Sequence, residues 1–415
     1  MNLHETIIGL AEKARAAAGE LAKCTTEGKN AALEAVAASL ERHESDIRAA
    51  NAEDVARASA SGLSPAMVDR LTLTPARFRA MVDGVRHVAT LPDPVGETLW
   101  TRPRPSGITI RKTRVPLGVV AVVFESRPNV FVDTAALCLK TGNAVILRGG
   151  KEAIETNKAL AKAVGEGVGE ALGEALASKL ASTGRTGLAA VQLVEILEHQ
   201  AVTELVRSVG LIDVAIPRGG ERLIRAMCEA ALIPVLKHYK GVCHIYVDDE
   251  ADLGMALSIL DNAKTQRPGV CNAAECLLVH RKLEPLFRPM VEAWARDKGV
   301  SLHEDEAGTE YLSLDINVAV VDDYRAAIDF INRYSSHHSE CIVTNNAERA
   351  KEFLRDVDSA CVYHNVSTRF TDGGEFGMGA EIGISTDKLH ARGPMGLEEL
   401  CTYKYLITGD GVVRE

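Results

Sequence analysis

Residues 119–124 read Val-Val-Ala-Val-Val-Phe, an unbroken apolar run with four β-branched valines. Such a run is typical of a strand that is buried on both faces, as in a parallel sheet covered by helices. A second run, Ala-Val-Ile-Leu, follows at 144–147, and a helical pattern over 132–140 separates the two. Strand, helix and strand in this order predict a βαβ unit and therefore a parallel sheet.

The same alternation continues along the chain and predicts an α/β fold with two doubly wound domains. Residues 1–90 carry apolar side chains at three-to-four spacing, which predicts helices that pack as one layer. The sequence predicts further strands at 190–194, 213–216, 234–236, 244–247, 275–280, 317–321, 340–343 and 360–363.

Two segments predict β-structure outside these domains. Residues 97–114 alternate apolar and polar side chains between prolines and glycines, which is typical of a hairpin arm. Residues 403–407 predict an edge strand near the end of the chain. We therefore expect three parts: residues 1–252 with 97–114 as an oligomerisation arm, residues 253–375, and residues 376–415 as a return segment with an oligomerisation strand. This organisation predicts a homo-oligomer, either a dimer or a tetramer.

Composition limits the partners of the chain. The 415 residues carry a net charge of −10, which disfavours nucleic acid and anionic membranes as bulk partners. No run reaches the ~18 apolar residues of a membrane span, and the first residues do not resemble a signal peptide. Nine cysteines without paired spacing fit a reducing compartment. We therefore expect a cytoplasmic protein that acts on a small molecule.

Cys271 follows the turn formers Pro268-Gly269 and precedes the apolar run 276–279. This order predicts a thiol in a loop at the end of a strand, where it can meet a ligand. Lys264 and Arg267 are close in sequence, and cations favour the nucleophilic thiolate. The alternative for this residue alone is a buried structural cysteine.

Two Arg-Gly-Gly turns follow expected strands, at 148–150 and 218–220. Ligands of open α/β sheets bind at the carboxyl ends of strands, paired glycines let the backbone approach a phosphate, and a helix N-terminus attracts it. Either turn alone could be a simple tight turn, but two in one domain favour a nucleotide site. No GxGxxG follows an expected strand. The expected cofactor-binding residues are Arg148, Gly149, Gly150, Lys151, Pro217, Arg218, Gly219 and Gly220.

Two polar runs adjoin expected strands. In 125–130, Arg127 can clamp a carboxylate or phosphate and Asn129 can donate to an oxyanion; the alternative is a local salt bridge with a helix cap. In 334–340, His337 and His338 are adjacent, so they tend to point to opposite sides, and neither Cys nor Asp stands at ligand spacing. We therefore expect no metal. A His-Cys hydrolase would leave both Arg-Gly-Gly turns without a role.

Taken together, these motifs resemble the γ-glutamyl phosphate reductases, also called glutamate-5-semialdehyde dehydrogenases, within the aldehyde dehydrogenase superfamily. The resemblance covers essentially the whole chain and is carried by 125–130, 147–150, 216–220 and 264–275. A signature region also matches over 321–342, with Phe330 standing where the family usually has histidine.

The resemblance implies an aldehyde-dehydrogenase-like fold, a nucleophilic thiol at Cys271 and NADPH/NADP as cofactor. It implies that L-glutamate 5-phosphate is reduced to L-glutamate 5-semialdehyde, the second step of proline biosynthesis, and it is compatible with association with glutamate 5-kinase. The thiolate would form a thioester as phosphate leaves, and hydride would then reduce the thioester. The Cys271 backbone N–H with the side-chain amide of Asn129 or Asn272 are candidate oxyanion donors.

Hydrolytic relatives carry a glutamate base in a Glu-Leu-Gly-Gly segment, whereas the corresponding residues 236–241 contain no carboxylate. This absence favours an acyl phosphate over hydrolysis to a free acid. NAD-using relatives commonly place a glutamate where Lys151 stands here, so the cation favours the 2′-phosphate of NADPH unless Lys151 is only a solvated residue.

The remaining candidates are substrate contacts. Arg127 and Arg267 are expected at the phosphate, and His338 and Ser339 at the amino-acid end. Two other functions stay open: an NAD-linked aldehyde dehydrogenase that forms the free acid, and a non-catalytic nucleotide-binding protein.

Overall fold

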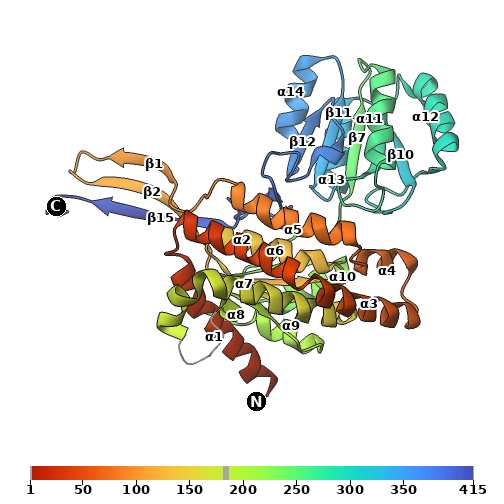
Figure 1. The fold of residues 1–415 in the computed structure, drawn as a ribbon. Helices are drawn as coiled ribbons and strands as arrows, with labels where there is room; N and C mark the ends of the chain where they lie inside the picture. The colour runs from red at the N-terminus through yellow and green to blue at the C-terminus, as the bar shows by residue number, and fades with distance from the viewer. Residues whose placement is uncertain (1, 181–186, 415) are drawn as a thin grey trace. The chain divides into compact units, whose positions relative to one another are not determined.

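The computed structural model describes residues 2–180 and 187–414, which form two compact units (Figure 1). The first unit comprises Met1–Leu236, Met378–Gly383 and Met395–Glu415, and the second comprises Lys237–Gly377 and Ile384–Pro394.

This division corrects two expected boundaries. We placed the first boundary after residue 252, but strand β7 (Cys243–Val247) is hydrogen-bonded between β8 (Ala274–His280) and β11 (Ser339–Val343) in the second unit. We also expected 376–415 to return to the first domain as one piece, but 384–394 lies in the second unit. An apolar run indicates that a strand is buried and does not say which sheet buries it, so the sequence pattern could not place β7.

The first unit is built on a parallel sheet of β3 (Val119–Phe124), β4 (Ala144–Arg148), β5 (Val191–Leu193) and β6 (Val214–Arg218), in the order β5-β4-β3-β6. The chain runs outward from β3 to β5 and then crosses to β6 on the other side of β3, which confirms double winding. The expected strand at 234–236 is reduced to an isolated bridge between Val235 and Ala215.

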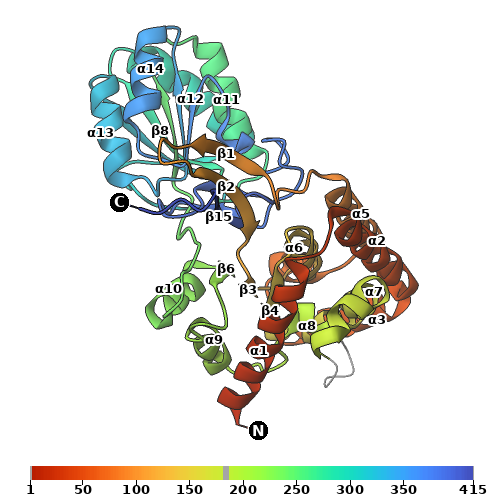
Figure 2. The same ribbon diagram turned by 90° about the vertical axis from the view of Figure 1, so that its left-hand side faces the viewer.

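Helices surround this sheet, and Figure 2 shows α2, α3, α5 and α7 gathered on one side of the strands, with α9 and α10 on the other. Side-chain caps define several starts: Asn2 and Glu5 form a capping box at α1, and Thr25 caps α2. The helices are α1 (Leu3–Leu21), α2 (Thr26–Arg42), α3 (Glu44–Ala60), α4 (Pro65–Leu71), α5 (Pro75–Thr90), α6 (Pro128–Lys140), α7 (Ile154–Leu180), α8 (Gly187–Ala190), α9 (His199–Val206) and α10 (Glu221–Ala230), with a 3₁₀ turn η1 (Lys151–Ala153).

The expected hairpin and tail strand form one antiparallel sheet of β1 (Thr98–Pro103), β2 (Thr109–Pro116) and β15 (Cys401–Thr408), in the order β1-β2-β15. Figure 1 shows this sheet projecting away from the helices of the same unit. Its apolar side chains Tyr403, Tyr405 and Ile407 are exposed.

The second unit has a parallel six-stranded sheet in the order β12-β11-β7-β8-β10-β9. Successive side chains of one strand point to opposite faces. Ile245 and Val247 of β7 pack with α11 and α12, whereas Tyr246 packs with α13 and α14, so helices cover both faces. The remaining elements are β9 (Ser301–His303), β10 (Asp315–Val321), β12 (Cys361–His364), α11 (Leu253–Thr265), α12 (Glu284–Lys298), α13 (Tyr324–Tyr334), α14 (Ala347–Asp356) and the turn η2 (Thr368–Phe370).

A two-stranded sheet of β13 (Gly383–Ser385) and β14 (Gly393–Met395) lies where the chain passes between the units. Among the residues that the structure describes, no helix combines the length and the apolar character that a membrane crossing requires.

Candidate active site

The candidate nucleophile Cys271 lies at the amino edge of the six-stranded sheet in the second unit. Cys271 occupies a turn between α11 and β8 and is half-buried, as the Pro-Gly signal predicted. The segments before β7 and β11 reach the same edge, because parallel strands begin on one side of a sheet. Residues 237–242, 266–273 and 335–338 therefore surround the sulfur.

Gly241 packs against the backbone of Cys271. A Cβ at Gly241 would stand 1.9 Å from the Cys271 carbonyl oxygen and 2.4 Å from its Cα, so only glycine fits without displacing the thiol loop. The N–H of Gly241 donates to Glu310 Oε1 at 2.7 Å. A carboxylate, that of Glu310, therefore does contact this loop. It lies outside residues 236–241, the segment in which we had looked for a glutamate base.

Two imidazoles flank the thiol. One ring nitrogen of His238, one of His338 and the sulfur of Cys271 all lie within 4.8 Å of one another. The rings of His238 and His338 meet edge to face, with centroids 5.6 Å apart. His238 Nδ1 donates to the carbonyl oxygen of Ile384 at 2.8 Å, so its Nε2 carries the lone pair. We did not single out His238 from the sequence.

His338 and Ser339 are fully buried. Burial, together with the neighbouring His238, lowers the pKa of His338 to about 3, so the ring is neutral at pH 7. The Ser339 hydroxyl lies 2.8 Å from His338 Nδ1 and 2.6 Å from Thr371 Oγ1, which also lies 2.7 Å from the hydroxyl of Tyr363. This chain of hydroxyls fixes the ring of His338. It includes Ser339, which we had expected at the amino-acid end of the substrate.

The side chain of Asn272 is engaged at both ends. Its Nδ2 donates to the carbonyl oxygen of Thr371 at 2.8 Å, and its Oδ1 accepts from the guanidinium of Arg369. Thr368 Oγ1 also donates to the Asn272 carbonyl oxygen at 2.7 Å. Asn272 therefore fastens the thiol loop to residues 368–371. In this conformation its side-chain amide has no hydrogen left to donate to a substrate.

The cations near Cys271 differ from those we expected. Lys264 is buried and paired with Glu275 at 2.7 Å, so its charge is already used. Burial raises the pKa of Glu275 to about 7, against the pull of Lys264. Arg369 takes the place of Lys264: burial lowers its pKa, whereas a thiolate at Cys271 raises it. Arg267 is exposed and close enough to Arg369 to lower that pKa further, so two guanidiniums serve this loop.

The neighbouring thiols of Cys243 and Cys271 have different surroundings. Its Sγ donates to the Cys271 carbonyl oxygen at 3.2 Å, and burial raises the pKa of Cys243 well above its usual value. The Cys243 thiol is therefore a structural donor, and the half-buried Cys271 is the better candidate for a reactive thiol.

The candidate cofactor loops lie together in the first unit, at the carboxyl edge of its sheet. Arg148 pairs with Val123, and Arg218 pairs with Phe124, so the loops after β3, β4 and β6 begin at one level. The order in which strands are added to the sheet reverses between β3 and β6, and open α/β sheets bind ligands at such a position. The sequence correctly placed both Arg-Gly-Gly turns at this edge.

The loop after β4 has polar atoms without partners. Arg148 donates from Nη2 to the Leu197 carbonyl oxygen at 2.7 Å, but its buried Nε has no partner among the described residues. Both side-chain polar atoms of buried Asn157 are likewise unpaired there. A Cβ at Gly149 would stand 2.2 Å from Asn157 Nδ2, which explains the glycine. Exposed Lys151 opens η1 beside these groups, so the residues present fit an anionic ligand.

Backbone N–H groups in the loops after β3 and β6 donate hydrogen bonds to carboxylates. Glu125 accepts from the Gly220 N–H at 3.0 Å, where α10 begins, and Glu152 accepts from the Ser126 N–H at 2.9 Å. The helix N-terminus at Gly220 is thus capped by a side chain in this conformation. The arrangement matches the alternative of local capping, and an anion at 217–220 would have to displace Glu125.

Arg127 and Asn129 open helix α6 in the first unit. Arg127 is half-buried at the N-cap position, and exposed Asn129 donates from Nδ2 to Asp133 at 2.9 Å. Burial raises the pKa of Asp133 to about 6, although the Asn129 bond and the Arg218 charge oppose the shift.

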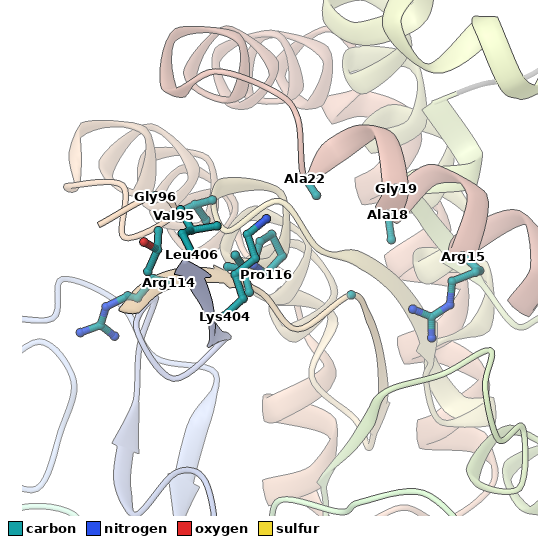
Figure 3. A pocket seen from close by; sticks show the side chains of 13 residues that line it. Arg15, Ala18, Gly19, Ala22, Val95, Gly96, Arg114, Pro116, Lys404 and Leu406 are labelled. Atoms are coloured by element: carbon teal, nitrogen blue, oxygen red, sulfur yellow. The ribbon is translucent and has the colours of Figure 1, made fainter. Parts of the chain in front are cut away.

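A cavity of about 590 Å³ lies at the other edge of this sheet, beside Gly118, which precedes β3 (Figure 3). Figure 3 shows Arg15 on one side of it and Arg114 with Lys404 on the other. Arg15 pairs with Asp213 at 2.9 Å, and Arg114 pairs with Glu97 at 2.8 Å. Residues 148–151 and 217–220 do not line this cavity, so it is not the expected cofactor site.

Comparison with known proteins identifies the family of this chain. The Aldehyde dehydrogenase family matches residues 4–308. Gamma-glutamyl phosphate reductase of Moorella thermoacetica is 48% identical over 433 residues, covering 100% of both chains, and that of Thermobifida fusca is 49% identical over 421 residues, covering 98% of each. The crystal structure of gamma-glutamyl phosphate reductase from Thermotoga maritima matches with a TM-score of 0.93 and 42% identity, covering 99% of this chain and 100% of that chain.

The chain belongs to the γ-glutamyl phosphate reductases of the aldehyde dehydrogenase family. The resemblance drawn from the sequence motifs is confirmed, as is the aldehyde-dehydrogenase-like α/β fold. The chain is therefore an oxidoreductase, and its family implies a nicotinamide cofactor.

The family assignment also gives a context for Phe330, the position that departs from the family pattern. Its ring meets His244 edge to face at 5.9 Å and Tyr334 at 4.7 Å, within the core between the sheet and α13. Phe330 thus packs beside the buried pair of His244 and Glu340, whose atoms lie 2.9 Å apart. Its role in this structure is to fill the core.

Proposed function

We propose that this enzyme reduces L-glutamate 5-phosphate to L-glutamate 5-semialdehyde and phosphate with NADPH, as the second step of proline biosynthesis. The observation that carries the proposal is the half-exposed thiol of Cys271 between two imidazoles, in a chain that matches gamma-glutamyl phosphate reductases over its full length.

The second unit would carry the acyl group. The Cys271 thiolate attacks the acyl carbon, the carbon–oxygen bond to phosphate breaks, and a thioester forms. Because Nδ1 of His238 donates to the Ile384 carbonyl oxygen, its Nε2 carries the lone pair and would take the thiol proton, and one nitrogen of this ring lies within 4.8 Å of the sulfur. The guanidiniums of Arg369 and Arg267 favour the thiolate and attract the phosphate.

The tetrahedral oxyanions need hydrogen-bond donors. Asn272 is committed to residues 369–371, so the backbone N–H of Cys271 is the better candidate within the second unit, and Asn129 is the candidate amide from the first. Collapse of the hemithioacetal returns the electron pair to sulfur and releases the semialdehyde.

The first unit would hold the cofactor. NADPH, when bound, supplies the hydride that reduces the thioester carbonyl. Lys151 and Arg148 would bind its 2′-phosphate, since one is exposed and the other has an unpaired buried Nε. Gly149 and Gly150 would let the backbone approach the ligand, and the 217–220 loop would contribute once Glu125 leaves the Gly220 N–H.

We also propose that the projecting sheet of β1, β2 and β15 joins copies of the chain, because its apolar side chains are exposed. A cytoplasmic location is supported by nine free cysteines. Association with glutamate 5-kinase remains an expectation from the chemistry, since acyl phosphates hydrolyse readily.

The test is an assay in the oxidative direction with glutamate 5-semialdehyde and NADP⁺. NADP⁺ reduction should require inorganic phosphate, and glutamate 5-phosphate should accumulate. Equal rates without phosphate would contradict the proposal and favour an aldehyde dehydrogenase that forms the free acid.

Glu310 makes that second function worth testing separately, because its carboxylate contacts the thiol loop through Gly241. If Glu310 activated water, Glu310→Gln would abolish a phosphate-independent rate. We expect no such rate in either the wild type or the variant.

A further inference from the structure

The thiol site contains a set of metal-ligand atoms that the sequence spacing did not reveal. The prediction of no metal considered only residues near His337 and His338 in sequence. The structure instead brings together His238, Cys271 and His338 from the loops before β7, β8 and β11. One ligand atom of each lies within 4.8 Å of the other two.

The ring nitrogens are prepared for coordination. The His238 Nδ1–H donates to a backbone carbonyl, which fixes the ring and leaves the lone pair on Nε2. Metal-binding histidines usually have such a backbone or carboxylate partner on the second nitrogen. The Nδ1 of His338 lies 2.8 Å from the Ser339 hydroxyl, which holds this ring in place.

His338 supplies an independent observation. Its side chain is fully buried, and its Nε2 has no hydrogen-bond partner among the described residues. An unpaired buried nitrogen is destabilising, so a ligand for it would be favourable.

The chemistry of the set selects the metal class. Two imidazoles and one thiolate are ligands that Zn²⁺ and similar borderline-soft divalent ions prefer. Tetrahedral Zn²⁺ with bonds of about 2.0–2.3 Å needs ligand atoms about 3.5 Å apart. The three atoms would have to close by at most about 1.3 Å, which small rotations of the half-buried His238 and Cys271 side chains can supply.

We infer that His238, Cys271 and His338 form a reversible binding site for Zn²⁺ or a similar divalent ion, with the fourth position open to water. Binding displaces the thiol proton, because sulfur coordinates as thiolate, and it occupies the lone pair that would attack a substrate. The cations Arg267 and Arg369 oppose a second positive charge at the site, which favours reversible over permanent occupancy.

The ion would therefore hold the enzyme inactive and shield Cys271 from alkylation. The inhibition rests on the proposed function, whereas the binding and the shielding do not.

The direct test uses the full-length protein, freed of metal with a chelator, and Co²⁺ as a spectroscopic probe for Zn²⁺. One equivalent of Co²⁺ should give a sulfur-to-cobalt charge-transfer band, and Zn²⁺ should bleach it. Cys271→Ser should remove the band, and His238→Gln should weaken Zn²⁺ binding at least about tenfold. Absence of the band in the wild type would overturn the inference.

Matched controls separate the site from general effects. His337→Asn changes the neighbouring histidine, which bonds to the Asp358 carbonyl oxygen instead, and Cys228→Ser changes another half-exposed thiol. Both variants should keep the band and the affinity; loss of either property in a control would refute the assignment.

Alkylation gives a second readout that does not depend on catalysis. One equivalent of Zn²⁺ should slow the modification of Cys271 by iodoacetamide at least about tenfold in the wild type and not in His238→Gln. Circular dichroism should confirm that the variant is folded, and His338→Gln is added if it also folds. Equal protection in wild type and His238→Gln would show that His238 is not a ligand.

Discussion

The two parallel sheets of this enzyme use opposite edges. In the first unit the candidate cofactor loops follow β3, β4 and β6 at the carboxyl edge, as is usual for open α/β sheets. In the second unit the candidate nucleophile Cys271 and both imidazoles precede β7, β8 and β11 at the amino edge.

The chemistry at the two edges differs as well. The first edge offers glycines and exposed charges that a large anion can approach, whereas the second offers a sulfur between a half-buried and a fully buried imidazole, with buried hydroxyls beside them. The same architecture can thus present a binding surface at one edge and a shielded nucleophile at the other, and which edge is used depends on the loops.

The largest effect should come from the thiol itself. Cys271→Ser should lower kcat at least about 10³-fold, because a hydroxyl in the same place has no comparable ionisation. Steady-state NADPH oxidation with glutamate 5-phosphate measures this. Cys228→Ser, which changes a half-exposed cysteine in the first unit, should retain full activity. Normal turnover by the Cys271 variant would show that Cys271 is not the nucleophile and that the reaction does not take place at the amino edge.

A smaller loss of activity is expected when the loop that carries Cys271 is displaced while its own residues stay unchanged. Gly241→Ala puts a methyl group into the Cys271 backbone, which should cost about 1–3 kcal/mol of stability and up to about 10²-fold in kcat. Gly84→Ala is the control, since helix α5 has open space there and should gain about 0.5–1 kcal/mol. Urea unfolding and kcat are the measurements. An unchanged Gly241 variant would mean that this close contact does not position the sulfur.

The carboxyl edge of the first unit can be tested through cofactor choice. Lys151→Glu should shift the ratio of kcat/KM for NADPH over NADH by about 10- to 100-fold toward NADH, because one charge-assisted bond to the 2′-phosphate is replaced by repulsion. Lys162→Glu on α7 makes the same charge change at an exposed site and should leave the ratio alone. A ratio that moves equally in both variants would reflect net charge and not a phosphate site.

The smallest expected effect concerns the stability of the second sheet. The buried partner Glu340 raises the pKa of His244 to about 10, against the opposing effect of burial. A raised folded-state pKa stabilises the fold below the ordinary histidine value of about 6.5 and loses that contribution as pH rises toward 10.

The free energy of unfolding should therefore fall by about 1–3 kcal/mol over this range, in addition to other titrations. His244→Gln should show a shallower fall, and His303→Gln, which changes a more exposed histidine, should follow the wild type. Parallel curves for His244→Gln and wild type in urea unfolding would exclude this pair as the cause.

The sequence predicted the fold well where local pattern decides it. The valine run of β3 and the alternation of the arm gave the strand types, and the Pro-Gly turn placed Cys271 before β8. Predictions failed where distant segments meet. No local pattern indicates that β7 joins the second sheet, that Lys264 is neutralised by Glu275, or that Arg369 serves the thiol loop.

His238 shows the same limit at the site. It stands in a segment that we compared with relatives only for a missing carboxylate, and its position beside Cys271 follows from Gly241, whose lack of a side chain lets the two loops touch. The available signal was a histidine three residues before Gly241, in the segment that leads into a buried strand.

The central claim is that Cys271 at the amino edge carries the glutamyl group as a thioester. Mass spectrometry of the enzyme after reaction with glutamate 5-semialdehyde and NADP⁺ in the absence of phosphate tests it directly. One added glutamyl group is expected on the peptide that contains Cys271, and it should disappear when phosphate is added. An enzyme that reduces NADP⁺ without any adduct, or with the adduct on another cysteine, would contradict it.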